Sequence, residues 1–254
     1  MSDAIFNQAP MSILGTGLCI KNNETANSLG FKDCALDASL LPAMVRRRTS
    51  EATRIAVSAA TRACSNAATD HELPAVFVSL SGEIQVTDKL CQAIAKNEYP
   101  LSPTQFHNSV HNTASSYWSM ATNNQFPMMA MSALEDGFAL GLLESWCQLQ
   151  TGAEKILLVV YEEEAPTHLL PDYNWEPCAI SLVLGHTESQ LATISRPLQS
   201  TQESGYASEN SIASNSLATA GFPLLRTLLK NNSGTYCIEV SHSVLPWLAE
   251  VVIP

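Results

Sequence analysis

Two acidic residues, Glu135 and Asp136, lie in a tight turn between a predicted strand and a predicted helix, in the segment FPMMAMSALEDGFALGLLES (residues 126–145). Enzymes that place a nucleophile at such a strand-to-helix elbow carry Ser or Cys there. The first turn of a helix presents free N–H groups and the positive end of the helix dipole. A thiolate would be activated there, whereas a carboxylate is only stabilised as an anion. The residues alone favour a helix capped by Asp136, with Glu135 an ordinary acid in the preceding turn.

A histidine pair, His107 and His111, occurs in the segment HNSVH. A spacing of four residues places two side chains on one face of a helix and resembles the metal-binding pattern H-E-x-x-H. Asn108 stands where that pattern has its glutamate, and no third ligand is evident. Because zinc sites need three or four ligands, helix packing and hydrogen bonding are favoured, and no metal is expected.

An arginine cluster, Arg46, Arg47 and Arg48, precedes a predicted helix in an otherwise acidic chain. The favoured interpretation is a solvated helix start, although cations there oppose the helix dipole. The alternative is an anion-docking patch for a phosphate-bearing partner. The sequence contains no P-loop, no dinucleotide fingerprint and no G-x-S-x-G motif, so no cofactor is expected.

The composition excludes several classes of function. The chain has 254 residues, is 46% hydrophobic and carries a formal charge of −11. The acidic balance argues against nucleic acid or an anionic membrane surface as a partner. Seven scattered cysteines without a C-x-x-C motif argue against a disulfide framework or a zinc site. No apolar run reaches membrane-spanning length and no secretory signal is evident, so a cytoplasmic protein is expected.

The elements that position these residues alternate along the chain. Strands are expected at residues 13–20, 74–82, 128–133, 155–166 and 177–186. Helices are expected at residues 46–68, 86–100, 102–122 and 136–150, the first capped by Ser50 or Thr49. A polar, Ser-rich loop (186–216), a short helix (217–230) and a strand (235–240) follow. This order predicts an α/β protein whose sheet is covered on both faces.

The elbow segment FPMMAMSALEDGFALGLLESWCQLQTGAEKILLVVYEE (126–163) resembles the nucleophile segment of β-ketoacyl synthases. In that family a Gly-Pro precedes the strand, a Cys stands at the elbow, and a buried helix leads to a Gly-Asp-Ala-like turn. Aligned without gaps from Pro127, the family's Cys falls on Glu135 and its turn glycine on Gly152, 17 residues later. The segments LPAMVRRRTSEATRIAVSAA and EPCAISLVLG resemble the shortened synthase homologues called chain length factors, in particular those of bacterial aryl polyene pigment clusters.

The resemblance implies a thiolase-like layered fold corresponding to the N-terminal half of a ketosynthase, with a truncated C-terminal half. It covers roughly residues 10–190, so we expect a ketosynthase-like domain at 1–190 and a short divergent segment at 191–254 that packs on it. The family's nucleophilic Cys is missing, and Cys147 lies too far along the helix to replace it. His242 matches neither catalytic histidine motif. Condensation needs both kinds of residue, so no catalytic residue and no elongation activity are expected.

The resemblance also implies partners: an intact β-ketoacyl synthase in a pseudo-symmetric heterodimer, and an acyl carrier protein that bears the growing polyene. The family dimerises through the strand before the elbow and nearby helices, here residues 127–133 and 102–122. The acyl tunnel at that interface limits chain length sterically, and plain core packing is an equal alternative for each candidate. The candidates are Phe106, Tyr117, Trp118, Met129, Met131, Leu134 and Phe138.

Two other functions remain open. The chain could be a divergent acyltransferase or decarboxylase that uses Glu135 or His111 as acid or base, because a carboxyl buried at the elbow could have a raised pKa. It could also be a docking subunit that recruits a carrier protein through Arg46, Arg47 and Arg48.

Overall fold

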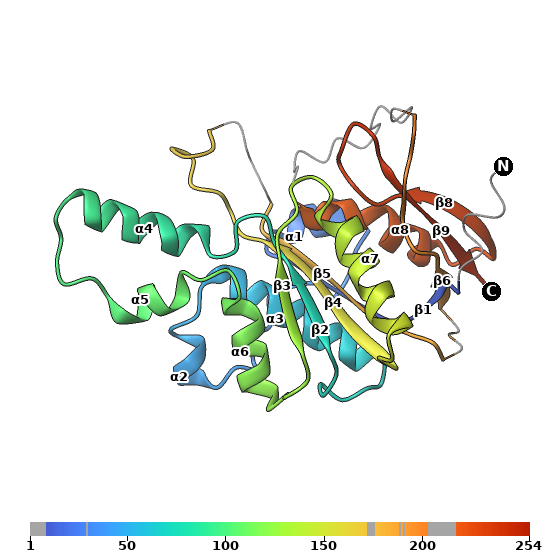
Figure 1. Ribbon diagram of the computed structural model, residues 1–254, viewed down its shortest axis with the longest axis horizontal. Helices are drawn as coiled ribbons and strands as arrows, with labels where there is room; N and C mark the ends of the chain where they lie inside the picture. The colour runs from blue at the N-terminus through green and yellow to red at the C-terminus, as the bar shows by residue number, and fades with distance from the viewer. Residues whose placement is uncertain (1–8, 29, 172–175, 188, 190, 203–216) are drawn as a thin grey trace.

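The computed structural model describes residues 9–28, 30–171, 176–187, 189, 191–202 and 217–254 (Figure 1). Its centre is a mixed nine-stranded sheet in the order β3-β2-β4-β5-β1-β6-β9-β7, with β8 paired to β9. The pairs β2–β3 and β2–β4 are parallel and the others are antiparallel. The strands are β1 Met11–Ile20, β2 Ala75–Val78, β3 Met128–Met131, β4 Lys155–Glu162, β5 Cys178–Gly185, β6 Ala192–Ile194, β7 Leu198–Gln199, β8 Gly234–Glu239 and β9 Trp247–Ile253.

Helices lie on both faces of the sheet, as the sequence predicted (Figure 1). They are α1 Asn23–Ser28, α2 Ala43–Arg46, α3 Glu51–Asn66, α4 Ile84–Ala95, α5 Pro103–Asn108, α6 Thr113–Thr122, α7 Gly137–Gln150, the 3₁₀ helix η1 Leu217–Gly221 and α8 Phe222–Lys230. The side chains of β4 alternate between two cores. Leu158 packs with Phe138 of α7, whereas Val159 packs with Ile55 of α3. The α/β class is confirmed.

The strand β1 lies against helix α3 without an intervening side chain. A Cβ added to Gly17 would overlap the Ala59 carbonyl oxygen and lie 2.7 Å from Ala63 N. The glycine in this first strand therefore permits a close approach between strand and helix backbones.

We expect Gly17→Ala to lower the free energy of unfolding by about 1–3 kcal/mol, because two backbones must separate to admit the methyl group. Gly141→Ala is the matched control: its Cβ would meet only side-chain ends, Leu158 Cδ1 at 2.8 Å and Val78 Cγ2 at 2.9 Å. Urea unfolding followed by tryptophan fluorescence measures both variants. Equal stability of Gly17→Ala and the wild type would contradict the proposed backbone contact.

The predicted long helix over residues 102–122 is wrong: the chain forms α5 and α6, separated by a turn at 109–112. Polar side chains in this segment bond to backbone or to distant groups and so compete with helical hydrogen bonds. The Asn108 Nδ2 group donates to Arg48 O at 2.6 Å, and Thr113 Oγ1 donates to Asn108 O at 3.1 Å. Ser102 caps α5 by accepting from Gln105 N at 3.3 Å, as predicted.

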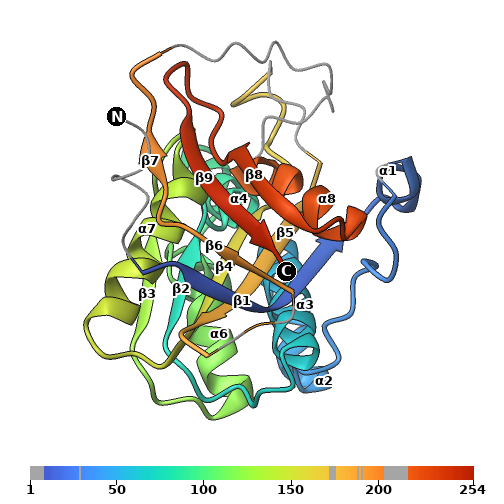
Figure 2. The same ribbon diagram turned by 90° about the vertical axis from the view of Figure 1, so that its right-hand side faces the viewer.

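The C-terminal part of the chain extends the same sheet beyond β1 (Figure 2). The strands β6 and β7 lie within the segment predicted to be a loop, so that prediction is wrong for residues 192–194 and 198–199. The predicted helix near 217–230 and the strand near 235–240 are confirmed as η1, α8 and β8. The strand β9, which the sequence analysis missed, joins β6, β7 and β8.

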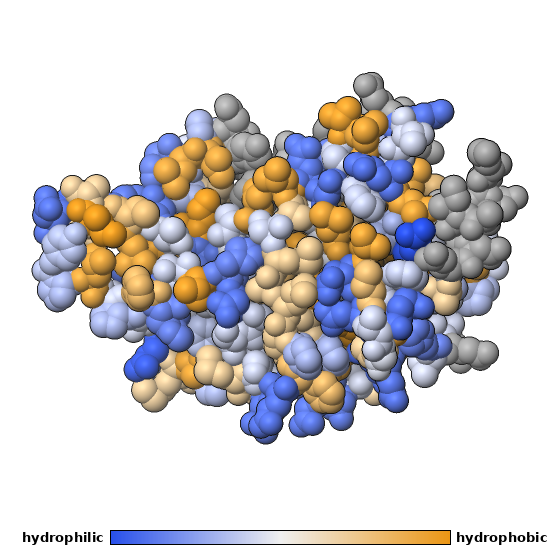
Figure 3. All heavy atoms as spheres, in the orientation of Figure 1, coloured by the Kyte–Doolittle hydropathy of each residue, from blue (hydrophilic) through white to orange (hydrophobic). Residues whose placement is uncertain are grey.

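An arm, defined as α4, the connection 96–102 and α5 (residues 84–108), projects from the sheet at the left of Figure 1. Hydrophobic residues gather on its surface (Figure 3). Ile94, Tyr99 and Phe106 are exposed there, and Val110 follows directly after the arm. Within the described part of the chain, no helix combines the length and apolar character needed to cross a bilayer.

Candidate functional site

The elbow connects β3 to α7, as the sequence predicted. Helix α7 begins at Gly137, and Asp136 is its N-cap residue by position. The expected side-chain cap is absent, because the Asp136 carboxylate instead accepts a hydrogen bond from Ser243 Oγ at 2.6 Å. The side chain of Glu135 is exposed. The backbone carbonyl oxygen of Glu135 accepts from the backbone N–H of His242 at 3.1 Å.

The loop between β8 and β9 lies over the elbow; we call residues 240–246 the C-terminal cover. Ser243 and His242 make the two contacts to the elbow described above. His242 Nε2 also hydrogen bonds with Thr219 Oγ1 of η1 at 2.9 Å. Sequence reasoning missed this arrangement because His242 is more than a hundred residues from the elbow and matches no motif.

Neither Cys147 of α7 nor Glu135 of the elbow has the environment that a nucleophilic thiol or a buried acid requires. Burial, followed by the nearby Glu144 carboxylate, raises the pKa of the Cys147 thiol, whereas a nucleophilic cysteine needs a lowered pKa. The exposed Glu135 contradicts the premise that a buried carboxyl stands at this turn. His111, the other proposed acid or base, is hydrogen bonded through Nε2 to Ser79 O at 2.9 Å.

The two histidines of HNSVH do not share a helix face. His107 is in α5 and its ring lies edge-on to Tyr117 with 6.5 Å between centroids, while His111 lies in the turn that follows α5. The predicted common face is wrong because the helix ends at Asn108. The described residues contain no group of three or more side chains placed to hold a metal ion.

A family model for the β-ketoacyl synthase N-terminal domain matches residues 21–247, which is most of the chain. This chain belongs to the β-ketoacyl synthase family. A comparison with curated proteins found no significant match.

Solved structures support the same fold for this synthase-family chain. A complex of the ketosynthase ApeO with its chain length factor ApeC from Xenorhabdus doucetiae matches with a TM-score of 0.70 and 20% identity, covering 95% of this chain and 99% of that chain. The ishigamide ketosynthase/chain length factor matches with a TM-score of 0.70 and 12% identity, covering 96% of this chain and 99% of that chain. A chain from the complex AntDE:AntF, a type II polyketide acyl carrier protein with its ketosynthase, matches with a TM-score of 0.71 and 10% identity. The match covers 97% of this chain and 100% of that chain. The predicted thiolase-like ketosynthase fold is confirmed.

Within the synthase-family chain, four of the predicted tunnel or interface residues reach the surface or its edge. Phe106 in the arm is 68% exposed, Met129 in β3 is 41% exposed and Leu134 in the elbow is 74% exposed. Met131 is half-buried and packs against the core that contains Phe138. The strand β3 forms the edge of the sheet, since its only strand partner among the described residues is β2.

The other three predicted tunnel residues lie inside the protein. Trp118 and Phe138 are fully buried, in the cores on opposite faces of the sheet. Tyr117 is also buried and donates its hydroxyl to Asn108 Oδ1 at 2.9 Å. These three side chains therefore support the helices α6 and α7 on either side of the sheet.

Arg48 of the arginine cluster lines a pocket of about 460 Å³ between α2, α5 and α6. The pocket is lined mainly by apolar side chains, and Arg48 contributes a cation to it. In the described part of the chain, none of Arg46, Arg47 and Arg48 forms an ion pair with a carboxylate. The pocket lining includes Met44, Val45, Arg48, Pro103, Tyr117 and Met120.

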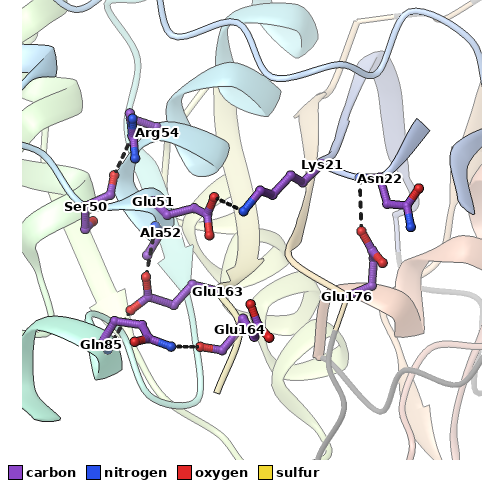
Figure 4. A network of polar contacts seen from close by, with 10 residues as sticks. All are labelled: Lys21, Asn22, Ser50, Glu51, Ala52, Arg54, Gln85, Glu163, Glu164 and Glu176. Atoms are coloured by element: carbon purple, nitrogen blue, oxygen red, sulfur yellow. Dashed lines mark hydrogen bonds and ion pairs between the residues drawn. The ribbon is translucent and has the colours of Figure 1, made fainter. Parts of the chain in front are cut away.

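A second feature that sequence reasoning did not identify is a buried carboxyl cluster, Glu83, Glu162 and Glu163, at the base of the arm. Part of this region is drawn in Figure 4. Burial is the main cause that raises the pKa of all three, to about 8 for Glu162 and about 7 for Glu163. The available sequence signal was the run of glutamates at 162–164 after an apolar strand, but this run predicted only the end of that strand.

Proposed function

We propose that this chain is a non-catalytic chain length factor that pairs with an active β-ketoacyl synthase and shapes the acyl tunnel in aryl polyene biosynthesis. The proposal is supported by the exposed Glu135 at the elbow of a synthase-family chain. The resemblance to the nucleophile segment aligns this residue with the family's Cys. A carboxylate cannot carry the acyl chain as a thioester. Two similar solved structures contain a ketosynthase with its chain length factor, and a third contains an acyl carrier protein with its ketosynthase.

The pairing face that we propose is the open edge of the sheet together with the neighbouring arm. The edge strand β3 presents unpaired backbone groups on one side, which is a template for association with another chain. Phe126 and Met129 at this edge and Phe106 on α5 expose large apolar surfaces. The cores of protein–protein interfaces are apolar, and exposed apolar patches of this kind mark interaction sites.

Co-expression with the synthase encoded beside this chain is the direct test. We expect the two chains to copurify through an affinity tag on either one and to coelute as a heterodimer or a multiple of it. A purified chain that stays monomeric and does not associate with that synthase would contradict the proposed function.

The tunnel that we propose runs at this pairing face, and Met131 is placed to limit its depth. Met131 lies between the exposed edge and the core that contains Phe138. Its thioether side chain is flexible and fills irregular apolar space.

We expect Met131→Ala, paired with the wild-type synthase, to lengthen the main product by about one two-carbon unit, because the substitution opens a cavity of about three heavy atoms. Mass spectrometry of the carrier-bound or released products measures the length. Leu142→Ala, which changes the same core at a fully buried helix position, is the control for a general loss of packing. An unchanged product distribution in Met131→Ala would exclude Met131 from the tunnel.

We also propose that the arginine cluster and its pocket receive the acyl carrier protein. Three guanidinium groups without an ion pair among the described residues, one of them lining an apolar pocket, complement an acidic, phosphate-bearing partner. In a chain with a formal charge of −11, such a basic patch also steers an acidic partner toward one face.

Replacing Arg46, Arg47 and Arg48 together by glutamine should weaken carrier binding by about 10- to 100-fold at low salt, since exposed ion pairs contribute up to about 1 kcal/mol each. Synthase pairing should be unchanged. The control is Lys230→Gln, which removes an exposed cation from α8. Carrier binding that is equally strong in the triple variant and in the control would rule out this docking site.

A further inference from the structure

The arm is attached to the body of the protein mainly by polar contacts at its base. Gln85, in the first turn of α4, donates from Nε2 to Glu164 O at 2.8 Å. Asp88, three residues further along α4, contacts His168, with 2.9 Å between Oδ1 and Nε2. The buried residues of α4 are only Asp88 and Leu90, so few apolar contacts fix this helix. Elements held in this way open locally at low free-energy cost.

Glu163 connects the arm to the body, because its carboxylate accepts from the first turns of two helices. Its Oε1 accepts from Gln85 N of α4 at 2.9 Å, and its Oε2 accepts from Ala52 N of α3 at 3.4 Å (Figure 4). The first-turn N–H groups of a helix have no partner within that helix, so this one buried side chain satisfies a donor at each helix start. Glu163 is 1% exposed.

Two further carboxyls crowd around this contact. Glu83, the N-cap residue of α4, accepts from Thr53 Oγ1 of α3 at 2.7 Å, and its Oε2 is buried without a hydrogen-bond partner among the described residues. Glu162 accepts from Leu80 N and from Ser81 Oγ, the latter at 3.3 Å. Full ionisation would place three negative charges in a buried region with one acceptor left unused, which is unfavourable.

The remaining charged and titratable groups around the cluster do not neutralise it. Lys21, which follows β1, forms an ion pair with Glu51 at 2.7 Å, and Arg54 of α3 donates to Ser50 O at 3.1 Å. Glu51 and Tyr161 interact electrostatically with the cluster. Lys21 interacts with Glu51, Glu164 and Arg54, and His111 hydrogen bonds to Ser79 O. Within this set no cation forms an ion pair with Glu83, Glu162 or Glu163.

We propose that the carboxyl cluster is a proton-controlled hinge: protonation keeps the arm fixed to the body, and loss of the proton loosens it. The consequence for partner binding rests on the proposed function, because the arm carries Phe106 of the proposed pairing face. A synthase would then meet an ordered arm in mildly acidic solution and a more mobile arm in alkaline solution.

The direction of the effect follows from linkage between protonation and opening. Burial, opposed by the N–H groups of Gln85 and Ala52, raises the pKa of Glu163 from 4.5 to about 7 in the closed arrangement. Opening exposes the carboxyl to water, where it ionises with its ordinary pKa. The stability of the closed arm is therefore complete below the ordinary pKa and is lost as the pH rises through about 7. For this group alone, opening should become about tenfold more favourable between about pH 6 and pH 8.

Hydrogen exchange of the isolated chain tests the hinge without any synthase. Protection factors of arm peptides, corrected for the intrinsic exchange rate at each pH, are compared between the wild type and two variants. We expect arm protection in the wild type to fall about tenfold between about pH 6 and pH 8. Glu163→Gln should remove most of this fall. The control Glu164→Gln, the same change at the neighbouring exposed position, should retain it.

Arm protection in the wild type that does not change between these pH values would overturn the hinge, and this part of the test needs no variant. Equal pH dependence in wild type and Glu163→Gln would overturn it as well. Binding to the synthase is measured separately at both pH values. Pairing absent at both values, with arm exchange that follows pH, would refute the proposed function and leave the hinge standing.

Discussion

A carboxylate placed on the proposed pairing face is expected to abolish association with the synthase and leave the fold intact. Met129→Glu puts a charge on the exposed edge strand, and Phe106→Glu puts one on the arm. Both side chains are exposed in the isolated chain, 41% and 68%, so the free protein loses little packing. In the complex each carboxylate would be desolvated without a partner, which costs about 3–5 kcal/mol.

That cost corresponds to an increase in Kd of at least about 100-fold for each single variant and more for the double variant. The measurement is a binding titration of the tagged synthase, with circular dichroism to establish that each variant is folded. Leu229→Glu is the matched control, since Leu229 is an exposed aliphatic residue on α8, at the other end of the sheet from β3. If Met129→Glu and Phe106→Glu bind as tightly as Leu229→Glu, the pairing face lies elsewhere on the molecule.

The parts of the fold that could be predicted from sequence are those whose signal is local. The apolar runs of β4 and β5 are fully buried strands, and the Ser50 side chain caps α3 by accepting from Thr53 N at 3.0 Å. The position of the elbow between β3 and α7 also followed from a strand pattern, a turn and a helix pattern. Each of these features depends on hydrophobic periodicity or capping within a few residues.

The features that could not be predicted depend on contacts between distant segments. The break between α5 and α6 follows from Asn108. Its side chain donates to Arg48 O and accepts from the Tyr117 hydroxyl, and these distant contacts compete with continuation of the helix. The contact between Ser243 and Asp136 joins residues 107 positions apart and depends on where the β8–β9 hairpin lies. The same is true of the carboxyl cluster, because the sequence does not reveal that Glu83 lies beside Glu162 and Glu163 or that Glu163 meets the starts of α3 and α4.

The elbow keeps a strand, a turn and a buried helix although an exposed glutamate stands in its turn. On one side of helix α7 the side chains of Phe138 and Leu142 are fully buried. The elbow before this helix is held by hydrogen bonds to the C-terminal cover. Such contacts position a strand edge and a helix whether or not a nucleophile stands between them. The fold can therefore serve the proposed pairing and tunnel roles while Glu135 points to solvent.

The wild type is expected to lose stability between about pH 5 and pH 8, and replacing Glu162 by glutamine is expected to remove much of this loss. Glu162 is fully buried at the end of β4, where it accepts from Leu80 N and Ser81 Oγ. Burial is the largest cause that raises its pKa from 4.5 to about 8; hydrogen bonds to the carboxylate oppose this shift, and the Glu163 charge adds to it. The folded state therefore retains a proton that the unfolded state has already released.

A raised folded-state pKa stabilises the protein fully below the ordinary pKa of the group, and this contribution disappears as the pH rises through about 8. A shift of this size corresponds to a change on the order of 5 kcal/mol across the window. Glutamine keeps a carbonyl oxygen for Leu80 N and cannot ionise. We therefore expect Glu162→Gln to be no more stable than the wild type near pH 5 and clearly more stable near pH 8.5.

Urea unfolding at several pH values, followed by tryptophan fluorescence, gives the free energy of unfolding of both proteins. Glu164→Gln removes a neighbouring exposed carboxyl and should reproduce the wild-type pH dependence. Curves for Glu162→Gln and the wild type that stay parallel from pH 5 to pH 8.5 would show that Glu162 is already ionised in the folded protein. In that case the buried carboxylate would have to be stabilised by its hydrogen bonds alone. The crossing of the two curves is therefore the result that separates a proton held by burial from a charge held by hydrogen bonds.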